Sequence, residues 1–320
     1  MILLRLRYDD GVRLRLGLPL LVTAVAAGAS LVAQDRIVRD GRPFQSGIEL
    51  TSITATVRDS QGRLVTGLAR DAFDVYEDGE RQEVTQFTNE RVPIGLGLLL
   101  DTSDSMFGQR LTDARAAVER FLFDLLDAGD EYFVLAFNHQ PHVLTAWTSR
   151  PEVVRRVLGR LQPSGGTAAY DAVMASLPMF VKRSRERAAI LIISDGADTT
   201  SDTALRDVRS ALRRSDAFAY AIAIDAPGAQ AINARVNPAA LREITDDSGG
   251  TTEVVRGTAD LAGATARIAE ELNSQYVLGY TSPKGADGQY HSIRVRMRGT
   301  DYRVRSRNGY VATPVNRSKD

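Results

Sequence analysis

The sequence contains no cysteine among its 320 residues. Disulfide bonds, thiolate metal sites, cysteine nucleophiles and a lipidated cysteine anchor are therefore excluded. Cysteine usage consequently gives no information on the redox compartment of the protein. Lysine is also scarce, so the positive charge comes almost entirely from arginine, and lysine occurs only at Lys182, Lys284 and Lys319.

Neither sign of charge is in excess, because 40 basic residues balance 40 acidic ones and the formal net charge is zero. A balanced charge gives no support for a general affinity for nucleic acid or for anionic membranes. The sequence also lacks the G-x-S-x-G motif, a P-loop and the H-E-x-x-H motif. We therefore expect a protein that is not an enzyme and does not bind nucleic acid.

Long hydrophobic runs are scarce too, and only Leu16–Val32 is long and apolar enough to be considered as a membrane span. Small residues follow its apolar core, and basic residues precede it. The basic residues are Arg5, Arg7, Arg13 and Arg15. This order is typical of a secretory signal peptide, with cleavage after Ala29 or Ala33. The alternative is an uncleaved anchor.

Either interpretation predicts export, to the periplasm, the outer surface or the medium. Membrane contact is expected only through this segment, if it is not cleaved. We assign residues 1–33 to the signal peptide or anchor and the polar residues 34–46 to a linker.

Between residues 92 and 274, apolar strands alternate with amphipathic helices. The predicted strands are Ile94–Leu100, Tyr132–Phe137, Ala189–Ser194, Phe218–Ile224 and Thr251–Val255, with a short antiparallel neighbour at Val143–Trp147. The predicted helices are Leu111–Leu126, Pro151–Leu161, Ala168–Val181, Thr203–Arg214, Ala239–Asp247 and Ala259–Asn273. Alternation of elements with these lengths predicts an α/β fold with a doubly wound, mostly parallel sheet.

Oxygen-bearing side chains gather where two of these strands and one glycine-rich loop end. They are Asp101, Ser103, Ser105, Thr167 and Asp195. In an open parallel sheet, ligands bind outside the carboxyl ends of the strands, so these side chains are placed to meet. Carboxylates and hydroxyls are hard donors, suited to Mg²⁺, Mn²⁺ or Ca²⁺ and poor for zinc or copper. The alternative interpretation is that Asp101 and Asp195 only cap loops and helices.

The segments on either side of the α/β region are predicted to be β-structure. Residues 47–91 have three or four strands, with a bulge where the alternation slips at Thr51 and Ser52 and a hairpin turn at Glu77–Glu80. Residues 275–312 end in two strictly alternating strands, which we expect to pair as a hairpin. Neither flank has enough apolar positions for a core, and both leave the α/β domain at the edge opposite Asp101. We therefore predict that they pair into one smaller, split all-β domain.

Arginines alternate along the two last predicted strands. They are Arg294, Arg296, Arg298, Arg303, Arg305 and Arg307. Such a ribbon could bind a polyanion, but we favour the solvated face of two paired strands. The polar residues 313–320 are expected to be a disordered tail.

The combined pattern resembles von Willebrand factor A domains and, over most of the mature chain, the related proteins of acidobacteria. The resemblance is carried by Gly67–Gly79, Leu98–Met106, Gly165–Ala172, Ser194–Asp198, Tyr276–Tyr280 and Arg307–Tyr310. It implies a metal-ion-dependent adhesion site. In this family pattern the three hydroxyls contact the metal and the two aspartates often act through water.

Two further aspartates lie close to this motif in the sequence. Asp104 departs from the family pattern, in which a glycine is common at that position. Asp104 and Asp198 are candidates for contacting the metal ligands without binding the metal themselves. The alternative, which we prefer, is that they cap loops.

The resemblance implies a protein-binding module of the adhesion type, with Mg²⁺ as the expected cation and Mn²⁺ or Ca²⁺ as alternatives. If other charges are remote, the cation attracts a carboxylate from a protein partner. The first alternative is a scaffold component of an envelope assembly, in which the metal only stabilises the fold. The second is a Mg²⁺-dependent hydrolase, which would need a general base. His139 and His142 follow the second strand, but we interpret them as surface-loop residues.

Overall fold

The structure is a computed structural model that describes residues 50–196, 198–225, 238–285 and 287–312. The expected signal peptide or anchor, the linker and the C-terminal tail lie outside the described residues. All described residues belong to one compact unit, 46–320. Among them, no helix combines the length and the apolar character needed to cross a membrane.

The α/β half of the described chain is built on a six-stranded sheet. Its order is β10 (Thr252–Val255), β9 (Phe218–Ile224), β8 (Arg187–Ser194), β5 (Ile94–Asp101), β6 (Glu131–Phe137) and β7 (Pro141–Thr148). The strands are parallel except for β7, which pairs antiparallel to β6 at the edge. Every residue of β5 and β8 is buried, which explains their continuous apolar runs. The predicted doubly wound sheet is confirmed.

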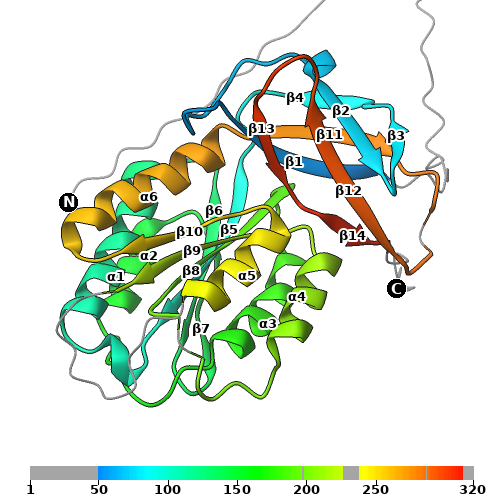
Figure 1. Ribbon diagram of the computed structural model, residues 1–320. Coiled ribbons are helices and arrows are strands. Elements are labelled where there is room, and N and C mark those ends of the chain that lie inside the picture. Colours follow the sequence, from blue (N-terminus) through cyan, green and yellow to red (C-terminus); the bar gives the residue numbers. More distant parts are fainter. Residues whose placement is uncertain (1–49, 197, 226–237, 286, 313–320) are drawn as a thin grey trace, which may run out of the picture. The chain divides into compact units, whose positions relative to one another are not determined.

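Helices cover both faces of this sheet (Figure 1). One face is covered by α1 (Gln109–Arg120) with its π-helical extension Phe121–Leu125, α2 (Pro151–Leu158) and α6 (Thr258–Asn273). The other is covered by α3 (Ala169–Phe180), α4 (Leu205–Arg214) and α5 (Pro238–Ser248). Successive strand residues point to opposite faces, so Leu98 and Leu100 pack in the first core and Leu99 in the second.

The two flanks of the chain together form two further antiparallel sheets within the described residues. One has the order β13 (Arg303–Ser306), β1 (Leu50–Arg58), β11 (Tyr276–Thr281) and β4 (Gln86–Thr88). The other has the order β14 (Gly309–Val311), β12 (Tyr290–Met297), β2 (Phe73–Glu77) and β3 (Glu80–Gln82). Ile53, Val75, Leu278 and Ile293 share one core between these sheets. The prediction that the two flanks pair is therefore confirmed.

The predicted bulge at Thr51 and Ser52 is wrong. Strand β1 pairs with β11 without interruption from Leu50 to Ala55. Thr51 occupies a buried, core-facing position in phase with Ile53, and its hydroxyl donates a hydrogen bond of 3.4 Å to the hydroxyl of Tyr310. The apparent slip arises because the apolar Leu50 is exposed whereas the polar Thr51 is buried.

The predicted hairpin of the two arginine-rich strands is also wrong. β12 pairs with β2 and β14, whereas β13 pairs with β1 in the other sheet. Val295 and Val304 instead approach the shared core from different sheets. The arginines therefore do not form one solvated face, since Arg305 turns inward to bind Glu271 of α6.

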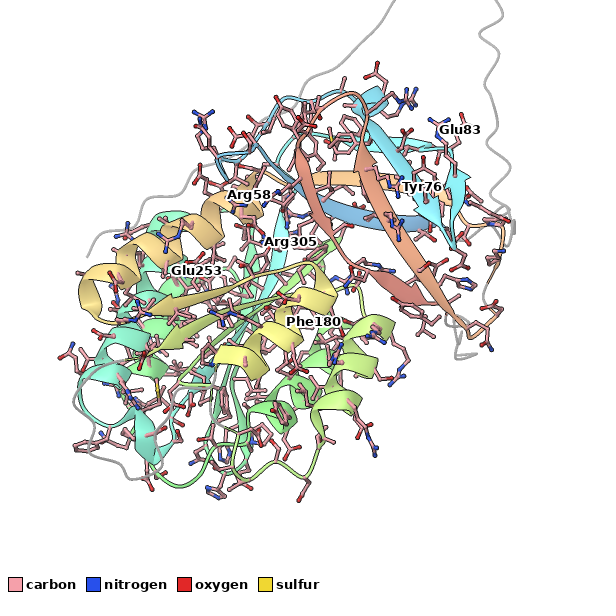
Figure 2. All side chains as sticks on the ribbon, viewed as in Figure 1. Arg58, Tyr76, Glu83, Phe180, Glu253 and Arg305 are labelled. Atoms are coloured by element: carbon pink, nitrogen blue, oxygen red, sulfur yellow. The ribbon has the colours of Figure 1, made fainter. Side chains whose placement is uncertain are left out.

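A polar network joins the β-sheets of the flanks to the α/β half. Figure 2 labels two of its members, Arg58 and Arg305. Glu271, which is fully buried, forms ion pairs with Arg58 of β1, at 2.8 Å, and with Arg305 of β13. The hydroxyl of Tyr220 in β9 donates a hydrogen bond of 3.0 Å to the same carboxylate. The C-terminal end of α6 is thus held by side chains from both halves.

Candidate metal centre

The candidate centre begins at the carboxyl ends of the adjacent strands β5 and β8. Asp101 is the last residue of β5 and is fully buried. Its Oδ2 accepts a hydrogen bond of 2.6 Å from the hydroxyl of Ser194, the last residue of β8, and its Oδ1 accepts one of 2.9 Å from the backbone N–H of Ser103. The carboxylate is therefore held between the two strand ends.

The environment of Asp101 disfavours its ionised form. Burial raises the pKa of Asp101 from its ordinary value of 3.8 to about 7, and the nearby charge of Asp195 adds to the rise. Hydrogen bonds from Ser103 and Ser194 oppose the rise but do not cancel it. A divalent cation beside this carboxylate would restore the ionised form, because an opposite charge offsets the loss of solvation.

Ser103 and Ser105 direct their hydroxyls toward each other. A hydrogen bond of 2.9 Å joins their Oγ atoms, and Ser103 is buried. In an octahedral Mg²⁺ complex, with oxygens about 2.0–2.1 Å from the ion, neighbouring ligand oxygens are about 2.9 Å apart. The two hydroxyls thus have the separation of adjacent ligands of one such ion.

Thr167 lies in a loop that pairs with both of the other segments. The backbone N–H of Asp104 donates to the carbonyl of Gly165 at 2.9 Å. On the other side, the backbone N–H groups of Thr199 and Thr200, which follow β8, donate to the carbonyl of Thr167 at 2.8 and 3.1 Å. Thr167 is buried. The three segments predicted to meet are therefore joined by hydrogen bonds.

The two glycines before Thr167 are required by this close approach. Gly165 has a φ of +75°, and a Cβ there would lie 3.0 Å from Nδ1 of His139. A Cβ on Gly166 would lie 2.4 Å from Cγ2 of Thr200, which is closer than atoms can pack. His139 and His142 are both exposed. His139 lies in a surface loop, as expected, and packs against this glycine-rich turn, whereas His142 lies in β7 and not in a loop.

Arg110 is a residue of the centre that the sequence did not indicate. It lies in the first turn of α1 and is buried. Its Nη1 donates to Oδ2 of Asp195 at 3.2 Å and to the carbonyl of Ser105 at 3.0 Å. Other charges are therefore not remote from the two aspartates, because Arg110 already compensates Asp195.

The two additional aspartates have different surroundings. Asp198 accepts hydrogen bonds from the backbone N–H of Tyr170 at 3.0 Å and from the hydroxyl of Ser201 at 2.7 Å. It therefore caps the start of α3, directly after the Thr167 loop, as we preferred from the sequence. The side chain of Asp104 is exposed, and its backbone N–H pairs with Gly165. Nothing in the structure explains why aspartate stands there instead of glycine.

The donor set of the centre fits a hard divalent cation. Within the described residues, no three histidine, cysteine, aspartate or glutamate side chains form a metal-binding group. The candidate centre depends on hydroxyls instead, with two carboxylates at the strand ends. Its chemistry suits Mg²⁺ or Mn²⁺, which prefer oxygen ligands and retain several waters.

Comparison with known proteins identifies the α/β half. Residues 96–197 match the family model of the von Willebrand factor type A domain. The chain contains a von Willebrand factor type A domain. This match covers β5 and β8, the Thr167 loop and both strand-end aspartates. The narrower resemblance to acidobacterial proteins stays a prediction.

One relative of this chain is an uncharacterized protein of Synechocystis sp., 28% identical over 117 residues. The match covers 36% of this chain and 28% of the relative, so this chain spans much less than the full length of that protein.

Several solved structures are similar to this chain at low sequence identity. Proximal thread matrix protein 1 of the mussel byssus is 12% identical with a TM-score of 0.50, covering 62% of this chain and 51% of that one. Another structure of that protein has a zinc-occupied metal-ion-dependent adhesion site, with 12% identity, a TM-score of 0.49 and coverage of 61% and 49%. The von Willebrand factor type A protein of Catenulispora acidiphila is 13% identical, with a TM-score of 0.49 and coverage of 82% and 74%.

Proposed function

We propose that the von Willebrand factor A domain binds a divalent cation and, through it, a carboxylate of a protein partner. Ser103, Ser105 and Thr167 would hold the cation through their hydroxyls, with Asp101 and Asp195 as the charged members of the site. The observation that carries the proposal is the convergence of the β5 end, the Thr167 loop and the segment after β8, which hydrogen bonds hold together around the buried Asp101 and Asp195.

Binding of a partner carboxylate follows from the charges in the centre. A bound Mg²⁺ would supply a site for an anionic oxygen in place of water. Arg110 reduces the negative charge that Asp195 presents to the cation, since the two side chains are 3.2 Å apart. The cation would therefore be only partly compensated by the protein, which favours an added carboxylate from outside.

Cation binding is tested by isothermal titration of the metal-free protein with Mg²⁺, Mn²⁺, Ca²⁺ and Zn²⁺. Ser105→Ala removes one proposed ligand, and Ser60→Ala removes an exposed serine of the turn after β1. We expect Ser105→Ala to weaken binding by about tenfold or more, as a lost ligand does, and Ser60→Ala to bind like the wild type. Equal binding by all three proteins contradicts the proposed ligand set.

Partner capture is tested with native envelope extracts in Mg²⁺ and in EDTA, using wild type, Ser105→Ala and Ser60→Ala. The proposal predicts partners that are lost in EDTA and lost with Ser105→Ala. If folded Ser105→Ala binds no cation but captures the same partners, the metal is not the bridge, and the scaffold alternative is correct.

We further propose that the protein is exported, on the basis of the basic, apolar and small-residue order at residues 1–33. Fractionation followed by N-terminal sequencing tests this. A mature start after Ala29 or Ala33 supports cleavage, an intact N-terminus in the membrane supports the anchor, and an intact protein in the cytoplasm contradicts export.

A further inference from the structure

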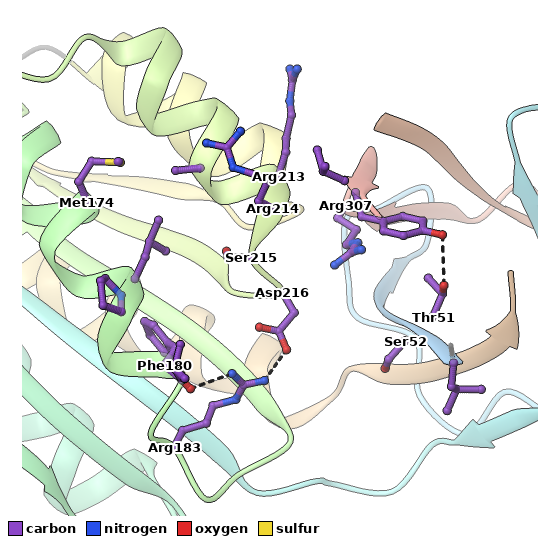
Figure 3. Close-up of a pocket in the computed structure, with 17 residues that line it drawn as sticks. Thr51, Ser52, Met174, Phe180, Arg183, Arg213, Arg214, Ser215, Asp216 and Arg307 are labelled. Carbon is purple, nitrogen blue, oxygen red and sulfur yellow. Dashed lines mark hydrogen bonds and ion pairs between the residues drawn. The ribbon is translucent and has the colours of Figure 1, made fainter. Parts of the chain in front are cut away.

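A groove of about 770 Å³ lies on the side of the molecule where α3 and α4 face β1 and β14 (Figure 3). It is separate from the metal centre, because none of Asp101, Ser103, Ser105, Thr167 and Asp195 lines it. A cavity of this size is typical of ligand-binding sites. The proposed metal function makes no use of it.

The wall formed by α3 is apolar. Met174 and Leu177 of α3 line the groove together with Val181, the residue directly after the helix, and Phe180 is buried behind them. Val181 is the most exposed of the large apolar side chains that the structure describes, with 86% of its surface accessible. An exposed apolar surface next to a hollow favours burial against another chain.

The opposite wall contains an incompletely paired strand. Leu50, Thr51 and Ser52 of β1 line the groove. β1 pairs with β11 from Leu50 to Ala55, but β13 covers its other edge only from Ala55 to Arg58. Among the described strands, none pairs with Leu50–Thr54 on that second edge. In antiparallel structure, alternate residues there direct their backbone N–H and C=O groups away from β11, which is the pattern to which an added strand binds.

The groove has a positive charge that is not locally balanced. Among the described residues, four arginines and one aspartate line it. Arg183 pairs with Asp216, and Arg213 pairs with Asp247 at 3.0 Å. The other two arginines are Arg214 and Arg307.

Arg214 and Arg307 have no carboxylate within ion-pair distance among the described residues. Arg214 is exposed and donates to the hydroxyl of Ser210 at 2.7 Å. The Nε of Arg307 is buried and has no hydrogen-bond partner within the described chain. Burial lowers the pKa of Arg307, as expected when a guanidinium lacks full compensation. Figure 3 shows Arg307 reaching into the groove. Its guanidinium lies 5.1 Å from the ring centroid of Tyr310.

We propose that this groove binds an extended, acidic segment of a partner protein, added as a strand to the open edge of β1. Its backbone pairs with Leu50–Thr54, its apolar side chains pack on Val181 and Leu177, and its carboxylates bind Arg214 and Arg307. Strand addition is an established mode of peptide recognition, in which backbone hydrogen bonds supply affinity and side-chain pockets supply specificity. The site is independent of the metal centre.

The test uses the full chain and a fluorescein-labelled peptide in which valine and glutamate alternate, with binding followed by fluorescence anisotropy. We expect saturable binding that is unchanged by EDTA. A peptide of alternating valine and lysine is expected to bind about tenfold or more weakly, because charge-assisted bonds contribute about 1.5–3 kcal/mol. The acidic peptide with alternate backbone nitrogens methylated is also expected to bind weakly, because it cannot complete the strand pairing.

Matched substitutions locate the site. Arg214→Gln and Val181→Asp are exposed positions in the groove, and Arg160→Gln and Val143→Asp are exposed controls outside it. We expect each groove variant to weaken binding of the acidic peptide by about tenfold and each control to bind like the wild type. Arg307→Gln is expected to have the same effect, and Arg214→Gln keeps the test valid if Arg307→Gln does not fold.

A crosslink identifies the occupant. Since the chain has no cysteine, Val181→Cys can be labelled uniquely with a benzophenone maleimide. Crosslinking to the acidic peptide supports the proposal. Crosslinking to residues 1–49 of the same chain overturns it and assigns the groove to the chain's own N-terminal segment. Absence of saturable binding, equal binding of the lysine peptide or loss of binding in EDTA also overturns it.

Discussion

Asp101 is a buried carboxylate whose ionisation the surrounding protein opposes. Burial raises its pKa from 3.8 to about 7 in the folded, metal-free protein. Between these two pKa values, the folded protein therefore keeps a proton on Asp101 that the unfolded chain has released. It follows that the stability of the metal-free protein falls as pH rises from about 4 to about 7.

Asp101→Asn is expected to abolish this loss of stability with rising pH. At about 1.4 kcal/mol per pKa unit, wild type in EDTA should lose a few kcal/mol more than Asp101→Asn between about pH 5 and about pH 8. Urea denaturation at the two pH values measures the difference. Asp301→Asn, at an exposed position, is the control and should behave as wild type. Parallel pH profiles for wild type and Asp101→Asn would falsify this account of the centre.

Arg110 is expected to support the centre through its buried contact with Asp195. Arg110→Met removes one partner of this pair, which typically lowers stability by about 3–5 kcal/mol. Mg²⁺ should recover part of the loss, because the cation supplies positive charge beside Asp195. The measurement is the urea midpoint of each protein in EDTA and in Mg²⁺.

The control for Arg110→Met is Arg156→Met, an exposed arginine of α2. It should leave both midpoints within about 0.5 kcal/mol of wild type. If Mg²⁺ stabilises Arg110→Met no more than it stabilises wild type, Arg110 and the cation do not share Asp195 as a common partner.

At the level of elements, strand β12 is joined to the β2–β3 turn by a histidine with two acidic neighbours. His291 is buried, and its Nδ1 and Nε2 lie 2.7 Å from Asp78 and 3.1 Å from Asp287. Burial lowers the pKa of His291, but the hydrogen bonds from its ring to Asp78 and Asp287 outweigh this, and the pKa lies above its ordinary value of 6.5. The protonated ring is therefore favoured in the folded state.

The stabilisation that protonated His291 contributes should be fully present below pH 6.5, which is its ordinary pKa. It should be lost as the pH rises through the raised pKa of His291 in the folded protein. His291→Gln is expected to lack this loss, so wild type should exceed it in stability by about 1 kcal/mol at acidic pH, with a smaller difference at alkaline pH. Urea denaturation across this range measures the effect. His142→Gln, at an exposed histidine of β7, is the control. A stability difference independent of pH would contradict the assignment.

At the level of elements, the sequence predicts a strand correctly where the residues of that strand alone indicate how it is buried. The continuous apolar runs of β5 and β8 arise because both faces of a central parallel strand are covered. β12 and β13 have the same alternation, but alternation specifies which side chains are buried and not which strand is the neighbour. Their assignment to different sheets was therefore beyond the local pattern.

For the whole molecule, Glu271 is the main charged link between the two halves. It is fully buried and pairs with Arg58 and Arg305 from the β-sheets of the flanks. Glu271→Gln leaves two guanidinium groups without this carboxylate, and the expected loss of stability is about 3–5 kcal/mol. Calorimetry should show one cooperative transition for wild type and separated transitions for the variant.

Glu270→Gln is the matched control, because Glu270 is the adjacent residue of α6 and is exposed. It should leave the transition within about 0.5 kcal/mol of wild type. A single unshifted transition in Glu271→Gln would show that the two halves are coupled by other contacts.

Some features of this protein were determined by its sequence alone. The sheet and the strand-end positions of Asp101 and Asp195 could be predicted, because hydrophobic periodicity reports burial within one segment and parallel strands bring their carboxyl ends to one edge. The Thr167 loop could be predicted for the same reason, since it precedes a helix of that sheet. The absence of cysteine excluded disulfides and thiolate chemistry directly.

Only the tertiary structure decided which distant side chains meet. The contact of Arg110 with Asp195 joins residues 85 positions apart, and that of Arg305 with Glu271 joins residues 34 positions apart. Neither arginine differs in its local sequence from an arginine on a solvated face. The pairing of a buried charge depends on packing between elements. That packing also leaves Leu50–Thr54 of β1 without a second partner among the described strands, beside the arginines of the groove.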